Sequence, residues 1–220
     1  MDLIRWVNPE SPINDPNCER EDPPKRKADP SMFDLAGMRK TGKRVRNGIL
    51  EAWEDGPEAQ EPVFEHRALQ MQLPLRRVDP TDVAKATRAI KEYMADKPGD
   101  IDYIDVARLQ PHLGVLRRAQ VQEEYDILDS EIHIIRMGNI AIATNPFEPF
   151  LTFGNQIKAR SAAEQTFLVQ IANGMESYIP TKEAEAGGHY SAYVGSGMVG
   201  HLGGEQLVRE TLQNIREMFV

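Results

Sequence analysis

The sequence predicts an α/β fold in which helices flank a mixed β-sheet. Segments with apolar side chains at every second position, a pattern typical of strands, alternate with segments whose apolar residues recur at helical spacing. One near-continuous apolar segment between two helical segments fits a strand covered on both faces. Together these patterns favour one sheet with helices packed against it.

The first part of the chain divides into an extended segment and a helix. Residues 1–30 are rich in proline and in both signs of charge, which predicts a proline-rich extended segment, while residues 31–220 form the α/β portion. The basic run 25–27 fits a solvated loop better than a nucleic-acid contact. Apolar residues at helical spacing predict a helix from Met32 to about Trp53.

The next elements are a strand and two helices. Residues 67–78 alternate apolar and polar, which predicts a half-buried strand, and Pro74 within it indicates an edge position. Asp79-Pro80 is a helix start with an acidic cap and proline in the first turn. Residues 101–126 are expected to form a surface helix interrupted at Pro111, with Arg117 and Arg118 on its polar face.

The C-terminal half carries the remaining strands. Residues 131–137 and 139–144 predict a hairpin about Gly138-Asn139. A helix over 149–160 leads to an apolar strand over 166–172, which we expect to be central and covered on both faces. Residues 181–204 are expected to be loop-rich, and a last helix begins near Gly204.

Composition excludes several classes of function. The net charge is -8 and the pI about 5.2, so electrostatics give no support for binding nucleic acid or an anionic membrane. No apolar run approaches the roughly 20 residues of a membrane helix. Cys18 is the only cysteine, so an intrachain disulfide is impossible. The N-terminus has no signal-peptide pattern, which predicts a cytoplasmic protein by default.

Chemistry-bearing residues gather at two predicted strand-to-helix corners, where open α/β sheets place their ligands. Glu148 stands at the first corner and could be a metal ligand, a general base or a helix cap. Asn173 and Tyr178 stand at the second. His189 and Tyr190 lie among glycines, in a loop suited to face a substrate. No two of the histidines have the close spacing of a local metal motif.

The C-terminal motifs resemble the neutral/alkaline non-lysosomal ceramidase family and its uncharacterised bacterial relatives. The motifs are Asn145-Pro-Phe-Glu148, a helix, a strand ending at Asn173, and Tyr178-Ile-Pro-Thr-Lys-Glu. The resemblance is good over 127–220 and weaker over 31–126. It implies that Glu148 and Tyr178 are zinc ligands and that Asn173 lies near the substrate. It also implies zinc-assisted hydrolysis of an amide in an N-acylsphingosine-like or other acylated substrate.

Two departures from the family pattern modify this expectation. Phe147 stands where the family often has glycine, and it could narrow the approach to the metal. The family's zinc histidines occur in an H-T-H-type motif that has no counterpart here. The sequence therefore predicts a partial domain with an incomplete zinc site, completed by an upstream segment, a complementary chain or a homo-oligomer. Ser11, in a segment loosely similar to the family's Ser-Pro-Asn motif, is a weak candidate nucleophile. The alternative is a non-catalytic α/β binding or assembly module that lacks the metal-binding histidines.

Overall fold

The structure is a computed structural model that describes residues 30–32, 34–56, 63–97, 99–188 and 190–219. The chain divides into two compact units, residues 1–59 and residues 60–220. In the first unit, η1 (Pro30–Met32) precedes α1 (Asp34–Asp55), which confirms the helix predicted there. The predicted extended segment 1–30 lies almost entirely outside the described residues.

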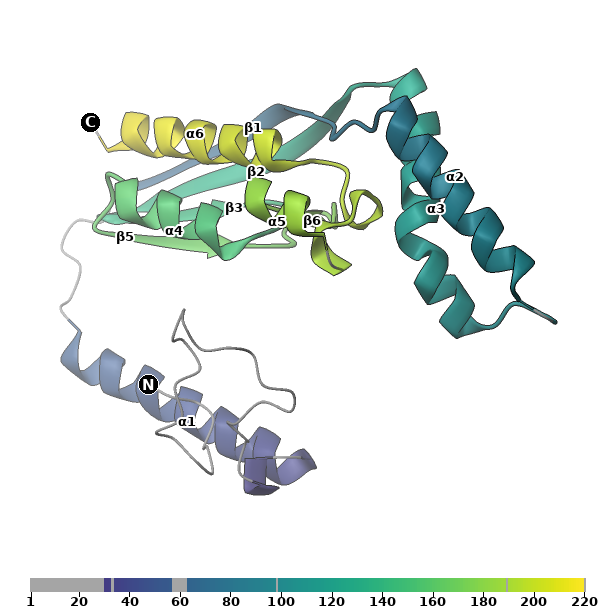
Figure 1. The fold of residues 1–220 in the computed structure, drawn as a ribbon. Coiled ribbons are helices and arrows are strands. Elements are labelled where there is room, and N and C mark those ends of the chain that lie inside the picture. Colours follow the sequence, from purple (N-terminus) through teal and green to yellow (C-terminus); the bar gives the residue numbers. More distant parts are fainter. Residues whose placement is uncertain (1–29, 33, 57–62, 98, 189, 220) are drawn as a thin grey trace. The chain divides into compact units, whose positions relative to one another are not determined.

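The second unit is built on a four-stranded mixed sheet (Figure 1). Its strands, in spatial order, are β1 (Phe64–Pro74), β2 (Ile127–Met137), β3 (Ile140–Thr144) and β5 (Gln165–Val169). The pairs β1–β2 and β2–β3 are antiparallel, whereas β3 and β5 are parallel. The predicted hairpin and the edge position of β1 are thus confirmed, and Pro74 is the last residue of that edge strand.

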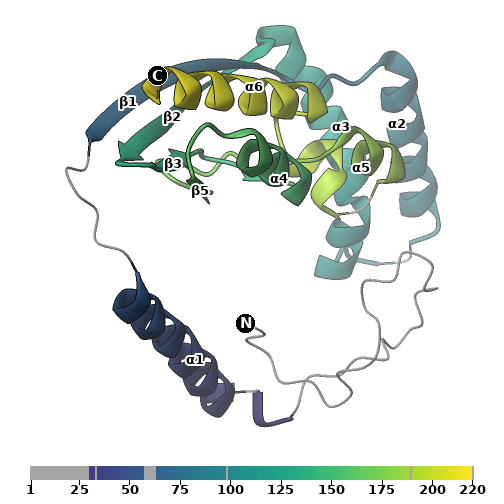
Figure 2. The same cartoon turned by 90° about the vertical axis from the view of Figure 1, so that its left-hand side faces the viewer.

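Two helices cover one face of this sheet. α4 (Leu151–Arg160) and α6 (His201–Met218) lie side by side on it, as Figures 1 and 2 show. The core between sheet and helices consists of fully buried apolar side chains, among them Met71, Leu73, Ile132, Ile134, Phe153, Leu207 and Ile215. The period of two along β1 and β2 and the helical period along α6 place these residues inward. The α/β class predicted from the sequence is therefore correct.

The opposite face of the sheet, here called the open face, presents the alternate residues of each strand. The register aligns Phe64, Met137, Ile140 and Gln165 in one row and His66, Ile135, Ile142 and Phe167 in the next. Phe64 is 71% exposed and Phe167 46% exposed. The expectation that the strand after α4 is central and doubly covered is wrong: β5 is an edge strand with one face open.

Between β1 and β2 the chain makes an α-helical hairpin of α2 (Pro80–Ala95) and α3 (Tyr103–Glu124). Asp79 and Asp102 each form a capping box at the start of these helices, as the acidic start at Asp79-Pro80 predicts. The predicted interruption at Pro111 does not occur. Proline removes one backbone hydrogen bond, and the capped N-terminus together with packing on α2 and on residues 194–196 sustains the helix.

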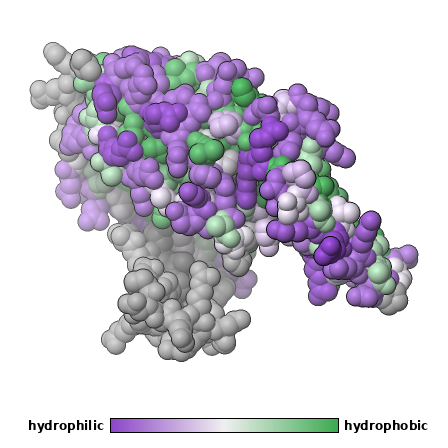
Figure 3. Space-filling view, turned by 45° about the horizontal axis from the view of Figure 1, so that its top comes forward, coloured by the Kyte–Doolittle hydropathy of each residue, from purple (hydrophilic) through white to green (hydrophobic). Residues whose placement is uncertain are grey.

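Short elements fill the rest of the second unit: β4 (Glu148–Pro149), β6 (Tyr178–Ile179), α5 (Lys182–Gly187), η2 (Tyr190–Ala192) and η3 (Val194–Ser196). The region 181–204 predicted as loop-rich therefore contains three short helical segments. The surface seen in Figure 3 is mostly hydrophilic, with hydrophobic residues scattered among polar ones. Among the described helices, none has the length and apolar character needed to cross a membrane.

Candidate functional site

Glu148 and Tyr178 stand opposite each other in a two-stranded parallel sheet. β4 and β6 pair with Glu148 aligned to Tyr178 and Pro149 to Ile179. The Glu148 amide donates to the Ser177 carbonyl at 3.0 Å, and the Phe150 amide donates to the Ile179 carbonyl at 3.0 Å. Paired strands run about 4.8 Å apart, so aligned side chains are close neighbours on one face. The two predicted ligands are thus brought together from opposite ends of the α4–β5 segment.

A chain of local interactions holds this corner in place. The Asn145 side chain accepts a hydrogen bond from the Phe147 amide at 3.0 Å, turning the chain after β3. Phe147 and Ile179 are fully buried and anchor both strands to the core. Phe147 therefore packs inward, and the expectation that it narrows the approach to a metal is wrong.

Glu148 is not a helix cap. The N-cap residue of α4 is Phe150, and it makes no side-chain capping bond. The carboxylate instead acts on Tyr178: the pKa of the Tyr178 phenol is raised, first by the charge of Glu148, then by burial and the neighbouring Tyr190, and by a hydrogen bond with Glu148. The capping alternative is excluded, and the roles of metal ligand and general base remain.

Tyr190 joins this pair, whereas the other predicted substrate residues do not. Its ring meets the Tyr178 ring edge to face, with centroids 6.0 Å apart and planes at 70°. His189 and Ser11 lie outside the described residues. Asn173 has a positive φ of 59° and donates to the Glu131 carboxylate on the open face. Glu148, Tyr178 and Tyr190 thus lie together, whereas Asn173 contacts Glu131 on the open face.

The fit of zinc to this pair is partial. Glu148 and Tyr178 offer two neighbouring oxygen donors, a carboxylate and a phenol. Catalytic zinc takes about three protein ligands and one water. Within the described part of the chain, no group of three or more His, Cys, Asp or Glu side chains could hold a metal ion. The raised pKa of Tyr178 also favours the phenol over the phenolate, the form that would bind a cation. A further ligand from elsewhere is needed to complete the site.

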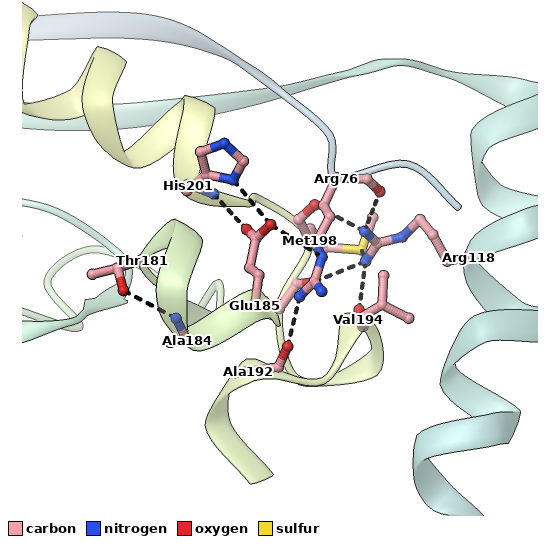
Figure 4. A network of polar contacts seen from close by, with 10 residues as sticks. Arg76, Arg118, Thr181, Ala184, Glu185, Ala192, Val194, Met198 and His201 are labelled. Atoms are coloured by element: carbon pink, nitrogen blue, oxygen red, sulfur yellow. Dashed lines mark hydrogen bonds and ion pairs between the residues drawn. The ribbon is translucent and has the colours of Figure 1, made fainter. Parts of the chain in front are cut away.

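A second polar network lies at the start of α6 and was not predicted from the sequence (Figure 4). Glu185 of α5 accepts a hydrogen bond from the His201 amide at 2.6 Å and pairs with His201 Nδ1 at 2.9 Å. Arg76 lies 3.7 Å from the same carboxylate and donates to the Ala192 carbonyl at 2.6 Å. Glu185 thereby caps the N-terminus of α6 from outside the helix, which is a structural role. Arg76, Glu185 and His201 are far apart in the sequence, so their spacing gives no sign of this contact.

Arg118 is the buried centre of the neighbouring contacts. The surface position expected for it is wrong, since it is only 4% exposed. Its guanidinium donates to the carbonyl oxygens of Arg76, Val194, Gly197 and Met198. These bonds join α3 to the segment 194–198, where Gly197 bridges to Ser177 next to Tyr178. Arg118 therefore holds the backbone behind the site.

Comparisons with known proteins give a distant structural likeness. No family model matches the chain, and no curated protein matches it. The crystal structure of neutral ceramidase from Pseudomonas aeruginosa is similar with a TM-score of 0.47 and 18% sequence identity. The match covers 82% of this chain and 32% of the ceramidase chain. At this identity and score, the likeness does not establish membership of that family or a shared activity.

Proposed function

We propose that this chain supplies two ligands, Glu148 and Tyr178, to the zinc site of an amide hydrolase that resembles neutral ceramidases. The observation that carries the proposal is the β4–β6 pairing, which aligns the two residues that the motif resemblance marks as ligands. Histidine ligands come from residues outside this sequence or from a complementary chain. The substrate class is an acylated small molecule or lipid of the N-acylsphingosine type.

The residues of this chain have defined tasks in such a site. Zinc, when bound, would polarise the amide carbonyl and lower the pKa of a bound water. Glu148 supplies a negative carboxylate, and Tyr178 supplies an oxygen whose proton must leave on metal binding. Tyr190 packs against Tyr178 and restricts its ring. Because the aligned strands are anchored by buried Phe147 and Ile179, both donors are held in place before a metal arrives.

Zinc content and amidase activity test this proposal. The chain is expressed alone and together with the coding sequence upstream of Met1, and each product is analysed for zinc and for hydrolysis of a fluorogenic N-acylsphingosine. We expect zinc and activity in the extended protein, and Glu148→Gln or Tyr178→Phe should abolish the activity and remove one equivalent of zinc. Glu205→Gln and Tyr103→Phe, both at exposed residues, are the matched controls. An extended protein that contains a zinc-histidine motif and yet binds no more zinc than its Glu148→Gln variant would refute the proposal.

The open face favours a second candidate, a non-catalytic binding or assembly module. It carries exposed apolar side chains on three strands, including Phe64, Met137, Phe167 and Val169. Exposed apolar surface of this kind is typical of association sites. In this case Phe167→Ser should lower the molar mass measured by light scattering, while Glu148→Ala and Tyr178→Phe leave it unchanged. A wild-type chain that is monomeric at every concentration tested would exclude self-assembly.

A further inference from the structure

Two histidines on the open face lie on neighbouring strands, diagonally across the pairing. His66 of β1 is aligned with Ile135, and His133 of β2 is aligned with Ala68. Alternate residues of a strand share a face, so both imidazoles project from the same side of the sheet. Diagonal neighbours in antiparallel strands are within reach of long and aromatic side chains. The register alone therefore places these two rings in contact.

The rings meet nitrogen to nitrogen. His66 Nε2 lies 2.9 Å from His133 Nδ1. The ring centroids are 5.1 Å apart and the planes differ by 14°. The distance between the centroids is longer than the distance between the two nitrogens by nearly twice the radius of an imidazole ring. Both nitrogens therefore lie close to the line that joins the centroids, and the rings face each other edge to edge. In the neutral pair one nitrogen must donate its proton and the other accept it.

The outer nitrogen of His133 is held by a carboxylate. His133 Nε2 lies 3.2 Å from Glu131 Oε1. Glu131 is fixed in turn by Gln70, which donates to its Oε2 at 2.8 Å, and by Asn173, which donates to Oε1. A proton on His133 Nε2 that points at Glu131 leaves Nδ1 as a lone pair aimed at His66. His66 Nε2 then donates the proton of this contact, and metal binding requires the other neutral tautomer of His66, with its proton on Nδ1. Histidines that bind metals commonly donate their other N–H to such a carboxylate, which sets the tautomer and raises basicity.

We propose that His66 Nε2 and His133 Nδ1 bind one divalent transition-metal ion of the zinc class, with water in the remaining positions. Two nitrogens bound to a tetrahedral zinc at about 2.0–2.1 Å lie about 3.3 Å apart. The two nitrogens must therefore separate by a few tenths of an ångström, and both rings must tilt so that their lone pairs point at an ion beside the line that joins them. His133 retains 25% side-chain exposure and His66 is exposed, which leaves room for this movement and for water. Imidazole pairs favour zinc, nickel and copper over magnesium.

This site is separate from the Glu148–Tyr178 pair and does not depend on the function proposed above. It offers two protein ligands, consistent with the finding that the described residues form no group of three or more acidic, histidine or cysteine ligands. Glu131 lies on the far side of the His133 ring from His66, so it orients the ligand and does not bind the ion itself.

Calorimetric titration of the untagged, metal-stripped chain with Zn²⁺ tests the proposal. We expect one equivalent of zinc to bind, no response to Mg²⁺, and loss of zinc binding in His66→Gln and in His133→Gln. Glu131→Gln should weaken binding about 10- to 100-fold without abolishing it, the usual effect of losing an orienting partner. His112→Gln, on α3, is the matched control and should bind like the wild type.

Two further readouts make the result decisive. In ¹⁵N spectra, zinc should shift the ring nitrogens of His66 and His133 and leave those of His112 in place. Thermal melts of the apo proteins check that each variant is folded. Unchanged binding in the folded His66→Gln and His133→Gln variants would overturn the proposal. Zinc binding that is lost in Glu148→Gln but kept in both histidine variants would overturn it as well, and would support the Glu148–Tyr178 site instead.

Discussion

Arg118 on α3 donates a hydrogen bond of 2.7 Å to the main-chain carbonyl of Arg76, just beyond the end of β1. The same guanidinium serves three carbonyls of the segment 194–198. Its removal leaves several buried acceptors unsatisfied, each at a cost of about 1–3 kcal/mol. Arg118→Met should therefore lower the free energy of unfolding by roughly 3 kcal/mol, measured by urea denaturation. Arg118→Lys should rescue little, because an ammonium lacks the planar fork.

The neighbouring Arg117 provides the control for that measurement. It is exposed, and within the described part of the chain it makes no hydrogen bond comparable to those of Arg118. Arg117→Met should change the free energy of unfolding by no more than about 0.5 kcal/mol. Equal losses in the two variants would show that charge on α3, and not the carbonyl contacts, is what stabilises the fold.

Gly204 on α6 permits the close approach of that helix to the core. A Cβ there would lie 2.5 Å from Phe153 Cζ and 2.8 Å from an Ile179 methyl. Alanine normally stabilises a helix over glycine by about 1 kcal/mol. Overpacking against these rigid groups costs about 1–3 kcal/mol, so Gly204→Ala should be destabilising overall. Urea denaturation shows whether the free energy of unfolding falls or rises in this variant.

Gly42 offers the opposite case in the first unit. A Cβ at this position of α1 meets nothing within 4 Å. Gly42→Ala should therefore raise helicity, with a gain of about 1 kcal/mol in helix stability. Circular dichroism of the two variants checks the contrast, and stabilisation by Gly204→Ala would contradict the close packing of α6.

Asp105 makes the α2–α3 hairpin sensitive to acid. It accepts hydrogen bonds from the Asp102 amide at 2.8 Å and the Tyr93 hydroxyl at 2.5 Å, and pairs with Lys97 at 2.6 Å. These contacts, led by the backbone bond, hold the pKa of the Asp105 carboxyl well below its usual range. A depressed folded-state pKa stabilises the protein above the unfolded value near pH ~4, and this stability is lost as pH falls.

The variant Asp105→Asn should lose less of its free energy of unfolding on acidification than the wild type does. It should be less stable than the wild type at pH 7, and the difference should shrink as pH falls below about 4, where the wild-type carboxyl becomes protonated in the unfolded chain. Thermal melts at several pH values measure this. Parallel stability curves for the two proteins would show that Asp105 does not carry the acid response.

Glu148 controls the ionisation of Tyr178. Its charge is the main cause of the raised pKa of the Tyr178 phenol. Glu148→Gln should therefore move that pKa down toward its ordinary value near ~10, because the neutral amide no longer opposes a phenolate. NMR titration of ring-labelled tyrosine measures the shift. Glu205→Gln should leave the pKa of Tyr178 unchanged. If Glu148→Gln also leaves that pKa unchanged, the charge of Glu148 does not act on the Tyr178 phenol.

Sequence patterns were sufficient where the signal lies within the element itself. The edge position of β1 followed from Pro74, and the start of α2 followed from its acidic cap. The apolar spacing of α6 predicted a helix, although the helix begins at His201 and not near Gly204. The apolar run of β5 was misleading, because Phe167 and Val169 look the same whether a second layer covers them or not. Arg118 was misassigned for a related reason: the four carbonyls that it binds come from segments remote in sequence.

The candidate sites show the same division. Glu148 and Tyr178 could be selected as candidates because each stands in a motif at a predicted strand-to-helix corner, and the structure brings them side by side. The contact between His66 and His133 could not be recognised, since it requires the register of β1 on β2 across the whole α2–α3 excursion. Asn173 was expected at a strand end near the substrate, but β5 ends at Val169, and the contact partner of Asn173, Glu131, lies on a strand two positions away in the sheet.

The excursion itself has a consequence for how the protein can be altered. Pro74 is aligned with Ile127, and the Leu75 amide donates to the Asp126 carbonyl at 2.8 Å, so the ends of residues 75–126 meet as the ends of a hairpin turn would. These contacts close the sheet register whatever the length of the segment inserted between them. A different insertion would keep the threading of the sheet, but it would also have to replace the four carbonyl contacts that Arg118 makes from α3.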